Sequence, residues 1–135
     1  MAEDNCDVLR RTVDAINRGD VDAVLETFDP AVVFEPQRAS IQGAYVGHDG
    51  IREWLADSEE NFTEFRFEVE HRDLGDGRVL SLGPVHVRTR GAGIDTAMPI
   101  AVIAVLRAGR IVSLKDYGER RQALRAAGLD AFNLP

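Results

Sequence analysis

An apolar hairpin near the C-terminal end constrains the fold of this chain more than any other feature. The segment Pro99–Leu106 is apolar throughout, the dipeptide Ala108-Gly109 predicts a tight turn, and Ile111–Tyr117 returns as a second strand. Strands that are apolar on both faces need cover on both faces. An acid in such a strand is either exposed by its geometry or buried for a functional reason, and that acid is Asp116.

Length and charge limit the classes of protein that fit. With 135 residues, the chain is expected to form one domain spanning residues 1–135, with a core at about 8–128 and short flexible termini. The formal net charge of −7 argues against nucleic acid and anionic membranes as partners. The single cysteine, Cys6, excludes an intrachain disulfide, and no signal or membrane-spanning segment is recognisable, so we expect a cytoplasmic protein.

The first half of the sequence has helical patterns with recognisable ends. Apolar residues recur at helical spacing from Val8 to Ile16, and Gly19 predicts the stop of this helix. Asp20 predicts the N-cap of a short second helix that reaches Phe28. Asp49 predicts the N-cap of a third helix over residues 50–61, whose apolar side contains Ile51, Trp54 and Leu55.

The second half is rich in strands. Strands are predicted at residues 31–35, 43–47, 63–72 and 78–90, followed by the hairpin and by a last helix over residues 119–127. Helices first and meandering strands later predict an α+β fold in which a strongly bent antiparallel sheet wraps around the helices.

Counting residue pairs predicts a polar row on the sheet. If Ala108-Gly109 is a two-residue turn, Ala101 lies opposite Asp116, and counting back across the preceding loop places His86 beside Ala101. Burial of Asp116 would raise its pKa and suit it to exchange a proton near neutral pH. Two alternatives stay open: strand alternation that leaves His86 in solvent, and an Asp116 paired with a neighbouring cation or a backbone amide.

Four segments resemble a known family. Residues 13–28, 33–36, 50–54 and 109–117 look like the SnoaL-like proteins of the nuclear transport factor 2-like superfamily, and the likeness extends over about residues 8–128. The resemblance implies a cone-shaped, cystatin-like α+β barrel with a closed-ended apolar pocket, which usually dimerises through the outer face of its sheet. Polyketide cyclases, ketosteroid isomerase, limonene epoxide hydrolase and dehydratases belong to this group.

The resemblance transfers the relatives' catalytic residues only in part. Asp116 matches one catalytic acid of the epoxide hydrolase, but Pro84 and His86 occupy the positions of its arginine and second acid. Glu35, just before a proline, matches the general base of the isomerase. The two oxyanion donors of that enzyme would fall on Thr12 and Ala101, which makes steroid isomerisation by that mechanism unfavourable.

The candidate site therefore combines acids with an apolar wall. Asp116, Glu35 and His86 are the candidate catalytic residues, although Glu35 could equally be a solvated strand end. The candidate substrate-binding residues are Thr12, Phe34, Tyr45, Trp54, Phe65, Phe67, Ala101, Ile103 and Leu114, with the aromatic members equally compatible with a purely structural core. The histidine spacings form no metal triad, and no cofactor is predicted.

Two functions remain open, and the sequence favours the first. One is a cofactor-independent enzyme that isomerises, cyclises, dehydrates or opens a small apolar oxygenated molecule, such as a polyketide, terpenoid or steroid-like compound, by acid/base catalysis. The other is a non-catalytic ligand-binding or dimerisation module. If Ala101 and Ile103 point inward, an apolar stripe is exposed on the opposite face and predicts a homodimer; it comprises Met98, Ile100, Val102, Ala104 and Leu106.

Overall fold

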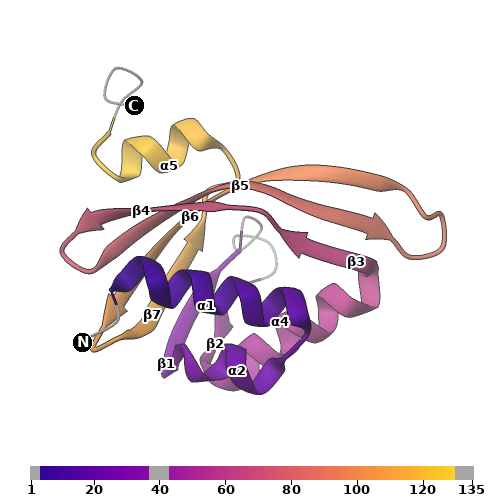
Figure 1. Ribbon diagram of the computed structural model, residues 1–135, viewed down its shortest axis with the longest axis horizontal. Coiled ribbons are helices and arrows are strands. Elements are labelled where there is room, and N and C mark those ends of the chain that lie inside the picture. Colours follow the sequence, from indigo (N-terminus) through magenta and orange to yellow (C-terminus); the bar gives the residue numbers. More distant parts are fainter. Residues whose placement is uncertain (1–3, 37–42, 130–135) are drawn as a thin grey trace.

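A curled sheet with helices on both faces forms the molecule (Figure 1). The computed structural model describes residues 4–36 and 43–129. In chain order its elements are α1 (Asn5–Arg18), α2 (Val21–Glu26), β1 (Phe28–Glu35), β2 (Tyr45–Val46), α4 (Gly47–Asn61), β3 (Phe62–Phe67), β4 (Glu70–Gly75), β5 (Arg78–Thr89), β6 (Asp95–Arg107), β7 (Arg110–Asp116) and α5 (Arg120–Ala126). Helices α1, α2 and α4 lie on one side of the sheet and α5 on the other, so the predicted α+β architecture is confirmed.

Local signals in the sequence fix most helix ends. Helix α1 ends where Gly19 adopts a left-handed conformation, and the Asp20 side chain accepts a hydrogen bond from the Ala23 amide at the start of α2. Two expectations were wrong by a few residues. Helix α2 ends before Phe28, which belongs to β1, and α4 begins at Gly47, so Asp49 lies within its first turn instead of capping it.

The sheet is mixed. Its order is β2-β1-β7-β6-β5-β3, and β4 also pairs with β5. All neighbouring pairs are antiparallel, as predicted, except β1 and β7, which run parallel. Parallel neighbours require a long connection, and here α4 and strands β2 to β6 all lie between β1 and β7 in the chain.

The pairing partner of β5 changes at the middle of this strand, near Gly83. Strands β3 and β4 pair with β5 in one continuous register, and the two residues between them leave the ladder opposite Gly83. The Glu68 amide still donates a hydrogen bond to the Pro84 carbonyl, at 3.0 Å. Gly83 has a φ of 148°, and a Cβ atom there would lie 2.5 Å from the Glu68 carbonyl oxygen. The backbone at Gly83 and the backbone at Glu68 can approach this closely because Gly83 has no side chain.

Two hydrogen bonds join helix α1 to the end of the edge strand β3. The Asn17 side-chain amide donates to the Phe67 carbonyl at 3.1 Å, and its oxygen accepts from the Phe67 amide at 2.9 Å. Both hydrogen-bonding groups of an edge-strand residue are thereby paired, because the side chain takes the place of a neighbouring strand. This contact holds α1 across the concave face of the sheet.

The predicted register of the hairpin is wrong because β7 contains a bulge. Arg107 pairs with Arg110 as predicted, but the register then shifts by one residue at Val112. Asp116 therefore lies opposite Val102 and not opposite Ala101. Because one extra residue reverses the faces of the partner strand, every β6 side chain lies on the face opposite to the one predicted.

The predicted His86–Ala101–Asp116 row is also wrong at its other end. Strand β6 already begins at Asp95, and in the observed register His86 lies opposite Ala97 instead of Ala101. The register between β5 and β6 runs without interruption past Gly83, so simple alternation puts His86 on the outer face, as the alternative interpretation expected.

The reversed faces of β6 remove the predicted apolar stripe. Ala101 and Ile103 pack in an outer cluster with Leu124 and its neighbours on α5. The residues of the expected stripe lie on the inner face instead: Met98, Ile100 and Val102 line a pocket there, with Met98 still 38% exposed, and Ala104 and Leu106 are buried in the main core. The apolar stripe therefore no longer supports a homodimer, and the homodimer stays a prediction.

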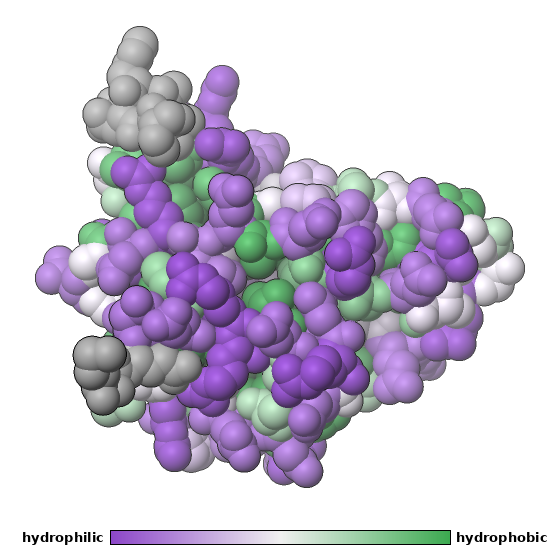
Figure 2. Space-filling model, in the orientation of Figure 1, coloured by the Kyte–Doolittle hydropathy of each residue, from purple (hydrophilic) through white to green (hydrophobic). Residues whose placement is uncertain are grey.

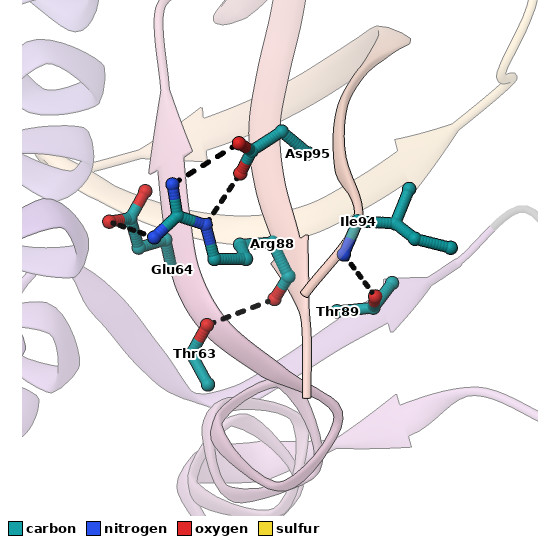
Figure 3. Close-up of polar contacts among 6 residues, drawn as sticks. All are labelled: Thr63, Glu64, Arg88, Thr89, Ile94 and Asp95. Atoms are coloured by element: carbon teal, nitrogen blue, oxygen red, sulfur yellow. Dashed lines mark hydrogen bonds and ion pairs between the residues drawn. The ribbon is translucent and has the colours of Figure 1, made fainter. Parts of the chain in front are cut away.

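The outer face of β3, β5 and β6 carries charged side chains (Figure 3). The Arg88 guanidinium donates to the Asp95 carboxylate at 2.6 Å and lies 3.6 Å from the Glu64 carboxylate on β3. The contact with Arg88 lowers the pKa of Asp95. Hydrophilic residues also dominate the face of the molecule that Figure 2 shows. None of the helices in the described residues is long and apolar enough to cross a membrane.

We expect Gly83→Ala to destabilise the protein more than Gly93→Ala. Both glycines have positive φ, but a Cβ at Gly93 would meet no atom within 4 Å, whereas at Gly83 it would collide with the Glu68 backbone. The strained φ alone should cost about 1–2 kcal/mol at Gly93, and the collision should add to this at Gly83. Urea unfolding followed by circular dichroism measures both free energies. Equal losses would show that the close approach at Gly83 does not shape the sheet.

Candidate functional site

A chamber of about 260 Å³ lies between the helices and the concave face of the sheet. Its volume is just below the roughly 300–1,000 Å³ of typical small-molecule sites. Most of the residues around it are apolar, and they come from α1, α4 and the strands: Leu9, Thr12, Val13, Ile16, Phe28, Phe34, Pro36, Ile51, Trp54, Ser58, Phe62, Phe65, Phe67, Val69, His71, Ser81, Val85, Met98, Ile100, Val102, Ile111, Leu114 and Asp116.

One wall of the chamber is aromatic. The Trp54 ring meets Phe34 edge to face with centroids 5.3 Å apart, and it lies 6.0 Å from Phe65, which in turn contacts Phe67 at 5.0 Å. These four rings were predicted from the sequence as substrate-binding residues, and all four line the chamber, as do Thr12 and Leu114. Their contact geometry fixes a rigid apolar surface against which a flat ligand can pack.

Three other predicted substrate-binding residues lie outside the chamber lining. Tyr45 stacks on Phe34 at 5.9 Å, but its hydroxyl turns to the Asp57 carboxylate on α4 at 3.1 Å. Burial and this hydrogen bond raise the pKa of Tyr45. Ala101 and Ile103 face the outer cluster under α5 because of the bulge at Val112.

Asp116 is the one carboxylate among the described residues that line the chamber. It lies at the C-terminal end of β7, and its side chain accepts a hydrogen bond from the Gly118 amide at 2.8 Å. Burial raises the pKa of Asp116 above its ordinary value, and hydrogen bonds to the backbone at Gly118 and Ala101 offset part of this shift. The Asp116 carboxylate is thus a proton acceptor whose position is fixed by the Gly118 amide, and the chamber that it faces is mostly apolar.

The register of the sheet creates a row of inward side chains that was not predicted. Asp116 pairs with Val102, Val102 with Ser81, and Ser81 with His71, so the row crosses β7, β6, β5 and β4. All four residues line the chamber. The row therefore has Asp116 at one end, Val102 in the middle, and two polar residues at the other end.

His71 and Ser81 contact each other directly. The His71 Nδ1 and Ser81 Oγ atoms are 2.7 Å apart. Burial, with a smaller contribution from Arg10, lowers the pKa of His71, which favours the neutral imidazole. His71 falls in the strand predicted at residues 63–72, and no role was predicted for it. Counting outward from the turn would not have found the pair: the register shifts by one residue between Asp73 and Gly75, and without this shift His71 would lie opposite Leu82.

The two other candidate catalytic residues lie away from the chamber lining. His86 is 39% exposed on the outer face, and its Nε2 atom lies 2.7 Å from the Glu68 carboxylate, a contact that lowers the pKa of Glu68. The Glu35 side chain is also partly exposed and lies 3.9 Å from the Lys115 ammonium, because alternation along β1 turns Phe34 inward and Glu35 outward.

Two hydroxyl groups in the lining already have partners within their own helices. Thr12 donates to the Val8 carbonyl at 2.7 Å, and Ser58 donates to the Trp54 carbonyl at 2.9 Å. Neither hydroxyl hydrogen is free for a ligand in this conformation. Among the residues that the structure describes, no group of histidine, cysteine and acidic side chains is arranged to hold a metal ion.

Comparison with known proteins agrees with this architecture. The sequence model of the SnoaL-like domain family matches residues 9–114. A search of curated protein sequences finds no significant match. Many solved structures are similar to the chain in fold.

Three of these structures illustrate the likeness. TerC, co-crystallised with polyporic acid, is 20% identical with a TM-score of 0.73, over 83% of this chain and 88% of its own. An NTF2-like protein of unknown function from Burkholderia pseudomallei is 21% identical with a TM-score of 0.76, over 92% and 97%. A candidate polyketide cyclase from Pseudomonas putida is 14% identical with a TM-score of 0.75, over 86% and 92%.

Replacing Asp116 by asparagine should change how stability depends on pH. Because the native pKa is raised, protonated Asp116 contributes stability that is fully present below the unfolded-state pKa of about 3.9 and is lost as pH rises through the native pKa. Asp116→Asn keeps an acceptor for the Gly118 amide and cannot lose this contribution. Its free energy of unfolding, relative to the wild type, should therefore increase with pH across that window and then level off.

Urea unfolding across the acidic and neutral range measures this difference. Asp22→Asn, on the exposed surface of α2 and outside the chamber lining, is the matched control for the removal of one carboxylate. A difference between Asp116→Asn and wild type that is independent of pH would mean that the carboxyl group titrates as it does in water.

Proposed function

Because the chain belongs to the SnoaL-like domain family, we propose that it is an enzyme that uses Asp116 as a general acid/base on a small, apolar, oxygenated molecule bound in the chamber. The observation that carries the proposal is the position of this acid. Asp116 is the only carboxylate among the described lining residues, and it faces an apolar chamber lined on one side by aromatic rings.

The proton chemistry follows from this environment. A carboxylate with a raised pKa is a stronger base than an ordinary aspartate, and its acid form is closer in pKa to neutral pH. It can accept a proton from an activated C–H or O–H group and return the same proton to another atom of the substrate. Isomerisation, cyclisation and dehydration each require such a transfer, and none of them requires a covalent bond to the protein.

The charge of the lining supports a neutral substrate. Asp116 and His71 are the only ionisable residues among the described residues of the lining, and no lysine or arginine lies there. An anionic ligand would have to leave water without meeting a cation, which is costly in an apolar site. The candidate polyketide cyclases among the structures of similar fold support a polyketide-like compound as one such substrate.

The residues that relatives use against an oxyanion have no counterpart at the matching positions. The Thr12 hydroxyl donates to its own helix, and Ala101 faces away from the chamber. This observation favours a second candidate function, in which the chamber binds the same class of ligand without turning it over. The epoxide hydrolase mechanism is incomplete, since Pro84 and His86 stand at two of its positions and neither lines the chamber.

Turnover separates these two functions. A panel of neutral bicyclic polyketide and terpenoid ketones is incubated with the protein, and products are followed by mass spectrometry. We expect product formation by the wild type and a loss of at least about 100-fold in Asp116→Asn, the usual scale for a general acid/base. Asp22→Asn, remote from the chamber, should retain the wild-type rate.

Two results would contradict the enzymatic proposal. Turnover that survives Asp116→Asn would remove the proposed role of this acid. Thermal stabilisation of the wild type by members of the panel, without any product, would support the ligand-binding function instead, because stabilisation needs only selective binding to the native state.

A further inference from the structure

We propose that His71 and Ser81 form a second polar site in the chamber, which binds a neutral hydroxyl or carbonyl oxygen of the ligand at the end opposite Asp116. The inference deepens the proposed function and rests on it. It specifies the ligand further, as a molecule with an oxygen function at each end of an apolar skeleton.

The hydrogen atoms of the pair determine what it can bind. A neutral imidazole and a serine hydroxyl carry one polar hydrogen each, and the contact of 2.7 Å between Nδ1 and Oγ uses one of them. If Nδ1 carries the hydrogen, the serine O–H and the Nε2 lone pair remain free. If Nε2 carries it, the serine donates to Nδ1, and the Nε2–H and the Oγ lone pairs remain free. In both tautomers the pair offers one donor and at least one acceptor.

These remaining groups have no other partner in the described part of the chain. The mutual contact is the single hydrogen bond found for the two side chains. No side-chain polar atom of the described residues is both buried and without a partner, so the unpaired Nε2 atom of His71 is not sealed in the core. Since both residues line the chamber, a ligand there can reach them.

The preference for a neutral oxygen follows from charge. His71 is kept neutral by burial, which lowers its pKa, and no cation lines the chamber among the described residues. A carboxylate or phosphate would meet a neutral pair at this end and a carboxyl group at the other. A hydroxyl or carbonyl group can use the donor, and a hydroxyl can use the acceptor as well.

The register sets the separation of the two polar ends. Neighbouring strands lie about 4.8 Å apart, so the backbones at Ser81 and Asp116 are roughly 10 Å apart, and His71 lies one strand further. The sheet is curled (Figure 1), and both ends of the row line the same chamber. Val102 occupies the row between Ser81 and Asp116, which leaves the middle of the ligand against an apolar side chain.

The inference predicts a preference between two probes that differ by one hydroxyl group. The probes are 2,6-dihydroxynaphthalene and 2-naphthol, with dissociation constants measured by isothermal titration calorimetry. A second hydrogen bond of ordinary net strength should make the wild type bind the diol about fivefold more tightly. Replacing both members of the pair, as Ser81→Ala together with His71→Phe, should remove this preference by leaving a single polar end. Ser58→Ala should keep it, because the Ser58 hydroxyl, also in the lining, is bonded to the Trp54 carbonyl.

A spectroscopic measurement reads the contact without any substitution at the pair. In the wild type, the diol should shift the ¹⁵N resonances of the His71 imidazole. Should the double variant of Ser81 and His71 retain the wild-type preference, or the His71 resonances of the wild type stay in place when the diol binds, the second polar site is wrong, while the proposed role of Asp116 in turnover stands. If neither probe binds the wild type at all, both the site and the proposed function are overturned.

Discussion

The close approach of the backbone at Gly83 to the backbone at Glu68 is the constraint on which the rest of the structure depends. A straight strand of the length of β5, 12 residues, would extend about 40 Å, whereas the 14 residues of α1 span only about 21 Å. A flat sheet of that length would leave half of its apolar face uncovered. The sheet is instead curled (Figure 1), and α1 contacts both β3 and β4, which pair with the two halves of β5 on either side of Gly83.

Whether a polar residue of the lining lies on a helix or on a strand explains what its side chain can do. Thr12 and Ser58 lie on helices, where a carbonyl of the preceding turn is always within reach and takes their hydrogen. His71, Ser81 and Asp116 lie on strands, whose carbonyls already pair with neighbouring strands, so their side chains must find partners elsewhere. The reactive capacity of the chamber is therefore concentrated on the sheet, and the helices supply its apolar cover.

Local signals in the sequence predicted the elements, and non-local register explains what was missed. Gly19 and Asp20 act through their own backbone conformation and hydrogen bonds, which a sequence displays directly. The bulge at Val112 has no such signal, since neither a glycine nor a proline marks it, yet it reverses the faces of β6. The inward position of Asp116 was nevertheless predicted, because it depends on burial of the strand end. The prediction of its partner on β6 was wrong, because the partner depends on an exact count of residues from the turn.

The separation between the acid and the donor limits the reactions that the chamber can support. When Asp116 removes a proton, negative charge develops on the substrate and must be stabilised by a donor placed where that charge accumulates. The donor that the chamber offers is the His71–Ser81 pair, two and three strands away from Asp116. Charge created beside Asp116 reaches that pair only along a conjugated skeleton that ends in an oxygen atom. A compact ketone with its acidic hydrogen next to the carbonyl would hold its charge near Val102, where nothing polar meets it, whereas an extended conjugated hydroxyketone would match both ends.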